Sequence, residues 1–321
     1  STHAFTFSNG ELEGSLDTTL SYGARWRLQD RDNAIIGIAN GGTAYSVNGD
    51  DGNLNYDKGL VSNVIKITPE MVLRYRNYGA FVRGTYFYDF EVMGNDTART
   101  PLSDAAKGEV GEKAELLDAY VWGSWNPGEK PLDVRIGNQV VNWGESTFIQ
   151  GGMNSINPVN VNSLRVPGAE LREALKPVPR LWANFGATDK VSVEGFYQTH
   201  WEETIIDPVG SYFSSSDLAG KGAEKVVLGF GSAPDNPAFP TTAVPRGDTR
   251  EAKDGGEYGI SMNYLTNSDT EFGFYFVNYH SRLPIISAQT GSVAGAVGGD
   301  YPASARYFLE YPEDIKILGT S

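Results

Sequence analysis

Residues 11–28 restrict the possible folds more than any other segment, because apolar or small side chains alternate with polar ones throughout. The even-numbered positions carry Leu12, Gly14, Leu16, Thr18, Leu20, Tyr22, Ala24, Trp26 and Leu28. The odd-numbered positions carry Glu11, Glu13, Ser15, Asp17, Thr19, Ser21, Gly23, Arg25 and Arg27. A period of two indicates a β-strand, and a strand of a soluble protein usually runs only about 5–6 residues. A strand of this length can cross a bilayer at the tilt found in barrels, so we predict an all-β fold, an antiparallel transmembrane β-barrel.

The same alternation recurs in pairs of segments that are joined by tight turns. The first pair runs through residues 65–76 and 82–91, around an Asn-Tyr-Gly turn at 77–79. Further pairs occupy residues 116–125 with 132–143, 181–187 with 191–201, and 258–265 with a strand that starts at 272. We count about ten strands up to Tyr311 and the beginning of another at 315–319.

Long connections separate these pairs, whereas the turns within the pairs are short. This asymmetry is typical of outer-membrane barrels, in which short turns face the periplasm and long loops lie outside the cell. The residues before the first strand would form a short N-terminal arm. Because bacterial barrels normally have an even number of strands, we expect further strands at the C-terminus of a single barrel domain that includes residues 1–321.

Composition excludes several other classes of protein. The net charge is −14 and Lys and Arg do not cluster, so a nucleic-acid partner is not expected. The chain has no cysteine, which excludes disulfides and thiolate metal sites. No stretch reaches the roughly 18–20 apolar residues that a membrane-spanning helix needs.

Residues 144–179 form a connection of unusual composition, because bulky apolar side chains are frequent among its Gly and Pro residues. A short helix is predicted at 169–175, where Ala, Leu and Glu predominate before Pro177 ends it. Apolar residues in this number are unfavourable in a solvated loop, so we expect the segment to plug or gate the barrel lumen. The candidate gate residues are Asn142, Trp143, Gly151, Met153, Asn157, Pro158, Leu164 and Leu171. By contrast, residues 34–58 and 210–257 are rich in polar and turn-forming residues and are expected to be mobile surface loops.

Residues 137–146, 157–160 and 171–179 carry a resemblance to a known family. Their sequences, GNQVVNWGES, NPVN and LREALKPVP, resemble those of an uncharacterised family of proteobacterial outer-membrane proteins, known chiefly as a domain of unknown function. The resemblance covers the whole chain and is strongest over residues 137–218. It implies an outer-membrane barrel of a Gram-negative bacterium, often encoded beside a periplasmic lipid-carrier-like protein and a resistance-nodulation-division transporter. It also implies movement of a hydrophobic or lipid-like compound across the envelope, with these two proteins as possible partners.

Charged residues on the polar faces of the strands are expected to point into the lumen, because a charge on the lipid face near the membrane midplane costs about 2–4 kcal/mol. The cations of this set are Arg25, Arg27, Lys66, Arg74, Arg76, Arg83 and Arg135. The anions on neighbouring strands are Glu70, Asp89, Glu91, Asp118 and Asp133. We favour pairing between the two sets over a ring of charges that selects ions. Aromatic residues near the strand ends, such as Trp26 and Trp201, fit the membrane interface, and a platform that stacks on sugars is the alternative.

Few residues have the spacing of a catalytic or metal site. The histidines are His3, His200 and His280, and their spacing does not suit metal ligands. His200 stands near Glu202 and Glu203, which allows a hydrolase as a minority hypothesis. Acidic loop residues offer Ca²⁺ ligands but lack the spacing of an EF-hand, so we interpret them as solvated loop tips. They are Asp50, Asp51 and Asp57 and, separately, Glu251, Asp254 and Glu257. The sequence therefore predicts no enzyme and no catalytic, cofactor or metal site.

The leading functional hypothesis is a monomeric outer-membrane barrel that passes a hydrophobic or lipid-like compound and contacts outer-membrane lipids and lipopolysaccharide. The second hypothesis is a general diffusion porin, or a surface-binding barrel whose long loops contact polysaccharide or another cell. The third is a soluble secreted β-protein that binds carbohydrate. Ionic conductance separates a porin from a plugged barrel, and a requirement for detergent separates both from the third class.

Overall fold

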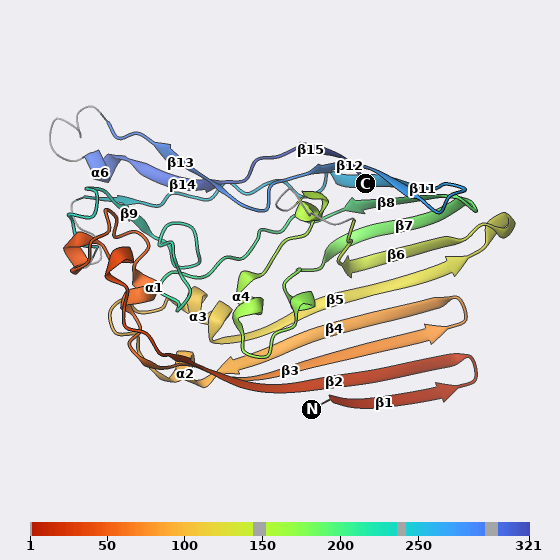
Figure 1. Cartoon of the computed structure of the whole chain (residues 1–321), viewed down its shortest axis with the longest axis horizontal. Helices are drawn as coiled ribbons and strands as arrows, with labels where there is room; N and C mark the ends of the chain where they lie inside the picture. Colours follow the sequence, from red (N-terminus) through yellow and green to blue (C-terminus); the bar gives the residue numbers. More distant parts are fainter. Residues whose placement is uncertain (1, 144–151, 236–241, 293–300) are drawn as a thin grey trace.

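The computed structural model describes residues 2–143, 152–235, 242–292 and 301–321. One antiparallel sheet of eleven strands dominates this part of the chain (Figure 1). The order of the strands across the sheet follows their order along the chain. They are β1 (Thr2–Asn9), β2 (Leu12–Arg27), β3 (Gly59–Tyr75), β4 (Tyr78–Asp89), β5 (Glu112–Trp125), β6 (Leu132–Gln139), β7 (Val178–Thr188), β8 (Val191–Gln198), β11 (Glu257–Leu265), β12 (Glu271–Tyr279) and β15 (Ile315–Thr320). The prediction of a β-rich chain with long antiparallel strands is confirmed.

The two ends of the sheet carry different connections. The short turns lie together at one end, and the long connections leave from the other (Figure 1). Two small hairpins belong to the long-connection end: β9 (Lys225–Val227) with β10 (Ala243–Pro245), and β13 (Ile285–Gln289) with β14 (Arg306–Glu310). The strand expected just before Tyr311 is therefore β14, which pairs outside the main sheet.

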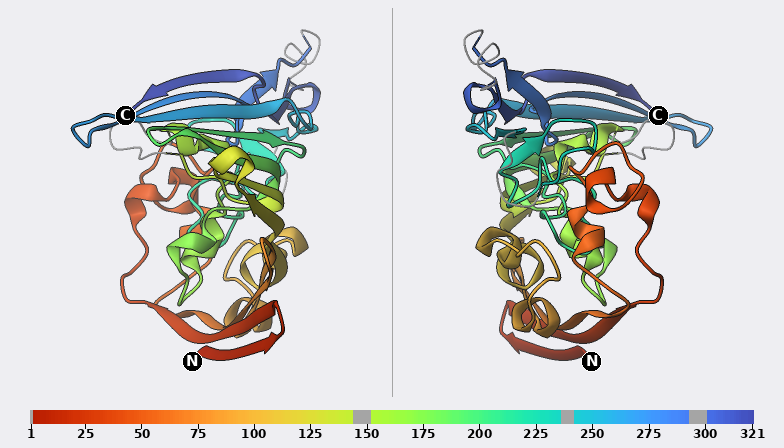
Figure 2. Two further views of the ribbon diagram at one scale, coloured as in Figure 1. Left: turned by 90° about the vertical axis from the view of Figure 1, so that its right-hand side faces the viewer. Right: turned by 90° about the vertical axis from the view of Figure 1, so that its left-hand side faces the viewer.

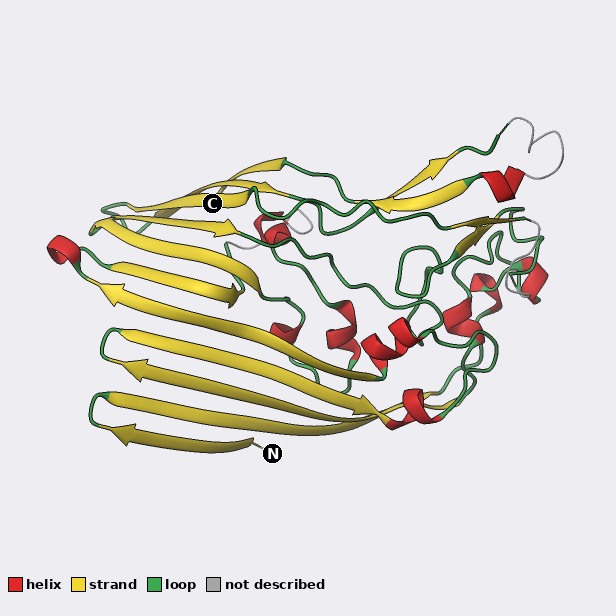
Figure 3. Ribbon diagram, turned by 180° about the vertical axis from the view of Figure 1, so that it is seen from behind, coloured by secondary structure: helices red, strands yellow, loops and turns green. Residues whose placement is uncertain are grey.

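Short helices gather at the long-connection end and inside the curve of the sheet (Figure 3). They are η1 (Asn33–Ile35), η2 (Ile38–Asn40), α1 (Asp51–Leu54), α2 (Phe90–Gly94), α3 (Asp104–Val110), η4 (Gly152–Ile156), α4 (Val161–Arg165), η5 (Leu171–Glu173) and α6 (Tyr301–Ser304). The helix η3 (Pro127–Glu129) instead forms the turn between β5 and β6. In the described ranges, no helix has both the length and the apolar character to cross a membrane.

The N-terminal segment is a strand rather than the expected arm. Residues of β1 pair with β2 in register, from Asn9 opposite Leu12 to Phe5 opposite Leu16 and beyond. Gly10 forms the turn with a φ of +62°, a conformation that glycine adopts without a steric penalty. The segment was too short for its alternation to stand out, so only its partner strand was predicted.

Two predicted strands end early because neighbouring loops take over their backbone hydrogen bonds. The strand expected at 132–143 ends at Gln139, and the carbonyl of Val141 accepts a hydrogen bond from Asn157 Nδ2 at 2.7 Å. The strand expected at 191–201 ends at Gln198, and the amide of Trp201 donates to Asp254 Oδ1 at 2.9 Å. Backbone groups that are not paired with a neighbouring strand need other hydrogen-bond partners. For Val141 and Trp201 these partners are the side chains of Asn157 and Asp254.

The sheet curves strongly, so that it has an outer and an inner face, with β1 and β15 at its two edges (Figure 2). Strand β11 shows the difference between the faces: Tyr258, Ile260 and Met262 are exposed, whereas Glu257 and Ser261 are buried. In β2, Leu16 and Leu20 are exposed; in β3, Ile65 and Ile67 are exposed while Lys66 and Thr68 are buried, although Val61 and Val64 near the start of β3 are also buried. The period-two pattern of the sequence thus corresponds to an apolar outer face and a polar inner face.

The two long connections that were expected to be mobile surface loops pack against each other. Val47, Val227 and Ala243 form a buried apolar cluster between them. The side chain of Asn48 binds both backbone groups of Val227, accepting from its amide at 2.7 Å and donating to its carbonyl at 2.9 Å. The prediction of free loops is wrong for these residues, because polar side chains of one loop satisfy the backbone of the other.

Candidate functional site

Residues 152–177, which we call the inner segment, lie against the inner face of the sheet (Figure 2). Asn160 starts α4, because its Oδ1 accepts hydrogen bonds from the amides of Asn162 at 3.1 Å and Ser163 at 3.4 Å. An Asn in this position satisfies amides that the first turn of a helix leaves unpaired. The sequence contains this capping signal, but the helix was predicted further along the chain.

Where the sequence predicts a helix at 169–175, only the single turn of η5 occurs. The amide of Asn160 donates to the carbonyl of Ala174 at 2.7 Å, and the amide of Lys176 donates to the carbonyl of Pro158 at 2.8 Å. These hydrogen bonds pair the two flanks of the inner segment with each other. The backbone groups that would extend the helix are therefore used in long-range pairing.

One end of the inner segment is attached to β2 and β3 by charged side chains. Lys66 Nζ lies 2.7 Å from Glu173 Oε2, and both side chains are buried. Arg172 lies 2.6 Å from Glu70, and Arg25 donates to the carbonyl of Arg165 at 2.6 Å. Breaking a buried ion pair leaves an uncompensated charge, so these contacts hold the segment in place.

A cavity of about 50 Å³ lies beside this attachment. Its lining includes Arg25 and Val64 from the sheet, Val166 from the inner segment, and Phe213 from the connection after β8. This volume admits a few water molecules but is far below the roughly 300–1,000 Å³ of a typical ligand pocket. The inner segment and Phe213 therefore leave only a small space beside this attachment.

The other end of the inner segment is held by four side chains, which we call the buried polar cluster: Arg180, Gln198, Glu257 and Arg282. Arg180 donates to Asn157 Oδ1 at 2.6 Å and to the carbonyl of Ile156 at 2.5 Å. Arg282 donates to the same carbonyl at 3.1 Å and lies 2.7 Å from Glu257 Oε1. Gln198 Oε1 accepts from both arginines. The cluster thus joins the sheet to the inner segment.

The buried polar cluster contains two guanidinium groups and one carboxylate. Burial lowers the pKa of Arg282 from its ordinary value, and the adjacent Glu257 opposes that shift. Carbonyl and amide oxygens accept hydrogen bonds from Arg180 and from Nη1 of Arg282, whereas Nε of Arg282 has no partner among the described residues. Because only Glu257 supplies the compensating charge within the cluster, its carboxylate is the critical element of this arrangement.

Apolar side chains lie directly beside the buried polar cluster. Trp143, Ile156, Trp182 and Phe196 belong to one buried cluster, and Met153 packs against it. Glu194 Oε1 accepts hydrogen bonds from the indole N–H of Trp143, at 2.5 Å, and from that of Trp182. The two indoles are therefore fixed in orientation, and the inner segment adds Met153 and Ile156 to their apolar surface.

The structure brings together three of the eight predicted gate residues. Trp143 and Met153 lie in the apolar cluster, and Asn157 binds Arg180 of the buried polar cluster. The carbonyl of Pro158 instead accepts a hydrogen bond from the amide of Lys176. The other predicted residues do not join them: Asn142 and Leu164 are exposed, Leu171 starts η5, and Gly151 lies outside the described residues.

The sequence analysis missed the residues that hold the gate candidates. Arg180 and Gln198 face each other across β7 and β8, but neither was predicted as a site residue. A signal was present, because Arg180 shares its strand face with Trp182, an unusual neighbour for a charge that points inward. Arg282 follows β12 in a connection, and the alternation of the strands contains no information about it.

Among the predicted lumen charges, Arg83 pairs with Asp118 of the neighbouring strand at 2.6 Å. Glu70 lies opposite Arg83 in the register of β3 and β4 but is paired with Arg172 of the inner segment. Asp89 accepts from Ser62 Oγ of the neighbouring β3 at 2.6 Å and caps α2, so its described hydrogen bonds come from neutral groups rather than from a strand cation. Connections folded onto the inner face supply partners that the strand pattern did not predict.

The remaining predicted lumen cations lie in other surroundings. Arg25 stacks on the ring of Phe213, and Arg27 donates to Asn53 Oδ1 at 2.5 Å. Arg74 and Arg76 are exposed at the short-turn end. Arg76 itself occupies the turn after β3, with a φ of +55°, so its assignment to a strand face is corrected.

The histidines occupy contrasting positions. His200 is half exposed, and its Nδ1 lies 2.8 Å from Asp254. His280 is fully buried, and its Nδ1 accepts from the amide of Asp314 at 3.0 Å while its Nε2 lies 3.0 Å from the carbonyl of Gly255. Its contacts are backbone groups, which fits a structural role in the described part of the chain.

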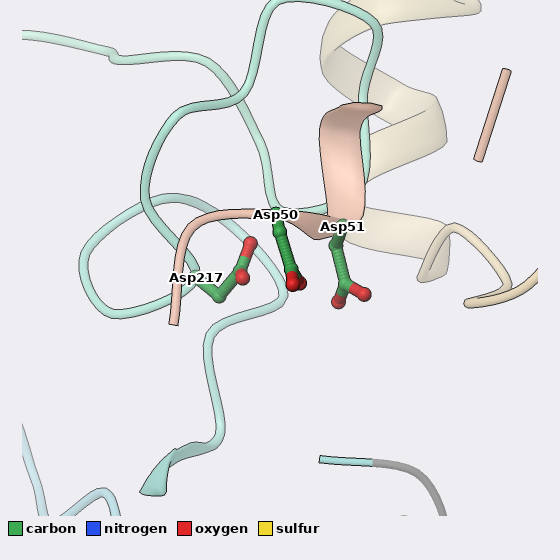
Figure 4. A group of neighbouring side chains, drawn as sticks. All are labelled: Asp50, Asp51 and Asp217. Atoms are coloured by element: carbon green, nitrogen blue, oxygen red, sulfur yellow. The ribbon is translucent and has the colours of Figure 1, made fainter. Parts of the chain in front are cut away.

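The acidic loop residues divide into exposed and buried groups. Asp57, Glu251 and Asp254 are exposed, as expected of solvated tips. Glu257 belongs to the buried polar cluster. Asp50 and Asp51 are also buried, and they meet Asp217, which was not singled out from the sequence (Figure 4). The expectation of solvated loop tips is therefore wrong for Asp50, Asp51 and Glu257.

The comparison with models of protein families finds a match over the full length of the sequence. The model of a family of proteins of unknown function, DUF1302, matches residues 1–321, the whole chain. The chain belongs to this family. No curated protein and no solved structure matches the chain at a significant level.

Proposed function

We propose that the protein is an outer-membrane β-barrel component through which a hydrophobic or lipid-like compound crosses the envelope, with the inner segment as its gate. The observation that carries this proposal is the contrast between the two faces of one sheet. Apolar side chains are exposed along the outer face, while a loop-derived segment is bound across the inner face by buried charges.

The outer face supports a membrane location. Leu20, Tyr22, Leu181 and Ile260 are among the large apolar side chains that it exposes. Soluble monomers rarely expose contiguous apolar patches of more than a few hundred Å², whereas this face extends over neighbouring strands. A lipid surround would bury these side chains, which supports the proposed location in the outer membrane of a Gram-negative bacterium, in contact with lipids and lipopolysaccharide.

The inner segment supports a gated path for an apolar cargo. Met153 and Ile156 lie on the surface formed by Trp143 and Trp182. If the segment moves away, these indoles line the vacated space with an apolar surface, while Glu194 keeps their orientation. A hydrophobic compound matches such a lining better than a hydrated ion does.

Two partners enter this proposal through the resemblance of the sequence to its family. A periplasmic lipid-carrier-like protein would deliver or receive the compound, and a resistance-nodulation-division transporter would supply the energy. Neither contact is assigned to residues of this chain.

A second candidate function, a general diffusion porin, requires an open water path, and the small cavity beside the inner segment favours the gated barrel over it. A surface-binding barrel would share the apolar outer face but gives the inner segment no role, and a carbohydrate-binding secreted protein accounts for neither feature.

The first experiment asks whether the full-length protein is a membrane barrel. Detergent-dependent extraction and a shift in mobility between boiled and unboiled samples are the expected results. A protein that is soluble without detergent and shows no shift would exclude the membrane location.

The second experiment tests the gate by replacing residues 146–175 with a short Gly/Ser linker. We expect the barrel to keep its heat-dependent mobility, while ionic conductance in planar bilayers and transfer of an apolar fluorescent dye into vesicles both change.

A matched pair of point variants tests the same idea without a deletion. Lys66→Met removes the buried partner of Glu173 and should increase conductance events, whereas Lys253→Met removes an exposed lysine that pairs with Asp314 and should not. Unchanged transport in the linker variant would exclude the gate.

A further inference from the structure

Three carboxylates from distant parts of the chain meet at the long-connection end of the sheet (Figure 4). Asp50 and Asp51 stand at the start of α1, in the connection after β2. Asp217 comes from the connection after β8. One carboxylate oxygen from each residue lies within 4.8 Å of the others. The sequence separates Asp217 from the other two by most of the sheet, so only the folded loops bring them together.

Asp50 has a buried oxygen atom that the described protein does not satisfy. Its side chain is fully buried, and Oδ2 accepts hydrogen bonds from the amide of Gly37 at 2.8 Å and from Asn40 at 2.9 Å. Oδ1 has no hydrogen-bond donor among the described residues. A buried carboxylate oxygen without a partner is costly, and a bound cation is a common way to satisfy one.

The other two carboxylates are also poorly compensated by the protein. Asp51 Oδ1 accepts a hydrogen bond from Thr100 at 2.8 Å. Neither carboxylate oxygen of Asp217 has a hydrogen-bond donor among the described residues. Arg99, whose charge acts on Asp50 and Asp51, forms an ion pair with a fourth buried carboxylate, Asp235. Three acidic groups therefore remain around one point, with a single guanidinium that is already engaged.

The geometry and chemistry of this group select the class of ligand. Ca²⁺ binds carboxylate and carbonyl oxygens at about 2.3–2.6 Å, so ligand atoms on opposite sides of the ion are about 5 Å apart. The spread of the three oxygens fits inside that sphere. Mg²⁺ requires shorter distances and near-octahedral geometry, and zinc prefers sulfur and nitrogen ligands. We propose that Asp50, Asp51 and Asp217 bind one Ca²⁺ ion that ties the connection after β2 to the connection after β8.

The contacts around the site indicate what the ion would stabilise. The amide of Asp217 donates to the carbonyl of Asn48 at 3.0 Å, so the two connections already touch beside the carboxylates. The same connection after β8 reaches the inner segment, where the amide of Val161 donates to the carbonyl of Ile205 at 2.9 Å. The ion locks these connections over the inner segment. This inference stands independently of the proposed transport function.

The test uses the full-length protein in whatever solvent keeps it folded, after removal of metal with a chelator. Titration with calcium chloride, followed by calorimetry, should show one site per chain. Calcium at about a hundredfold above its dissociation constant should raise the midpoint of thermal unfolding by about 5 °C or more. It should also slow proteolytic cleavage within residues 28–58 and 199–235.

The matched variants are Asp217→Asn and Asp57→Asn. Asp217→Asn keeps the shape of the side chain but removes a ligand charge, so calcium binding should fall at least tenfold. Asp57 lies in the same connection as Asp50 but is exposed and pairs with Arg31 at 3.1 Å, so its variant should bind calcium like the unmodified protein. If Asp217→Asn does not fold, calcium titration and proteolysis of the unmodified protein decide alone. Absence of calcium binding there, or equal binding of Mg²⁺, overturns the proposal.

Discussion

The outer face of the sheet is built from the strands' own residues, whereas the inner face is completed by side chains from distant loops. On the outer face, Leu16 and Leu20 of β2 and Ile260 of β11 are exposed in a regular alternation. On the inner face, Lys66 of β3 binds Glu173, which lies 107 positions further along the chain. Both faces belong to the same strands, so the difference arises from what covers each face.

This difference separates two kinds of stabilisation. Apolar outer residues depend on their surroundings, because burial in lipid removes them from water in proportion to their apolar area. Buried inner charges depend on individual partners, because the loss of one partner leaves the other uncompensated. We therefore expect single substitutions on the inner face to destabilise the protein in any solvent, and those on the outer face to act only in a membrane.

The largest effect is expected from Glu257→Gln in the buried polar cluster. The substitution leaves Arg180 and Arg282 buried opposite a neutral amide, which should lower the free energy of unfolding by about 3–5 kcal/mol. The matched control is Glu310→Gln, because Glu310 pairs with Arg250 at 3.4 Å on the surface and should contribute only about 0–1 kcal/mol. Denaturant unfolding followed by tryptophan fluorescence measures both. Equal losses would contradict the distinction between buried and exposed pairs.

A somewhat smaller effect is expected from Ile260→Arg on the outer face. In a bilayer, an arginine near the midplane of a lipid-facing strand should cost about 2–4 kcal/mol. Leu283→Arg is the control, because Leu283 is equally apolar and exposed but lies beyond the end of β12. Folding into lipid vesicles, compared between the two variants, measures the difference. If Ile260→Arg folds into vesicles as well as the control does, the outer face is not lipid-exposed and the membrane proposal fails.

The same contrast explains how much of the molecule could be predicted from the sequence. Alternation along 11–28 and the later pairs predicted the strands and their apolar face, because that information is local to each strand. The pairing of Glu70 could not be predicted in the same way. Its opposite strand residue is Arg83, yet it binds Arg172 from the inner segment, a partner that depends on how a long connection folds.

The candidate site shows the same limit in more detail. The composition of 144–179 predicted that this connection packs against something, and two of the candidate gate residues, Trp143 and Asn157, lie in such contacts. Arg282 and Gln198 were not among the candidates, because the buried polar cluster combines residues of β7, β8, β11 and the connection after β12. The strand pattern also did not predict that β6 ends at Gln139. The side chain of Asn157 donates a hydrogen bond to the carbonyl of Val141, and the alternation of the strand contains no information about that contact.

The smallest effect, and the sharpest test of the inner segment, comes from two helix caps in different places, one an asparagine and the other a serine. Asn160 caps α4 within the inner segment, and Ser103 caps α3 outside it, accepting from the amide of Ala106 at 3.1 Å. Replacing either with alanine should lower the free energy of unfolding by about 1 kcal/mol. Only Asn160→Ala should alter the transfer of an apolar dye through the reconstituted protein, because only α4 crosses the inner face. Similar transfer rates in both variants, despite similar losses of stability, would mean that the inner segment is a structural support rather than a gate.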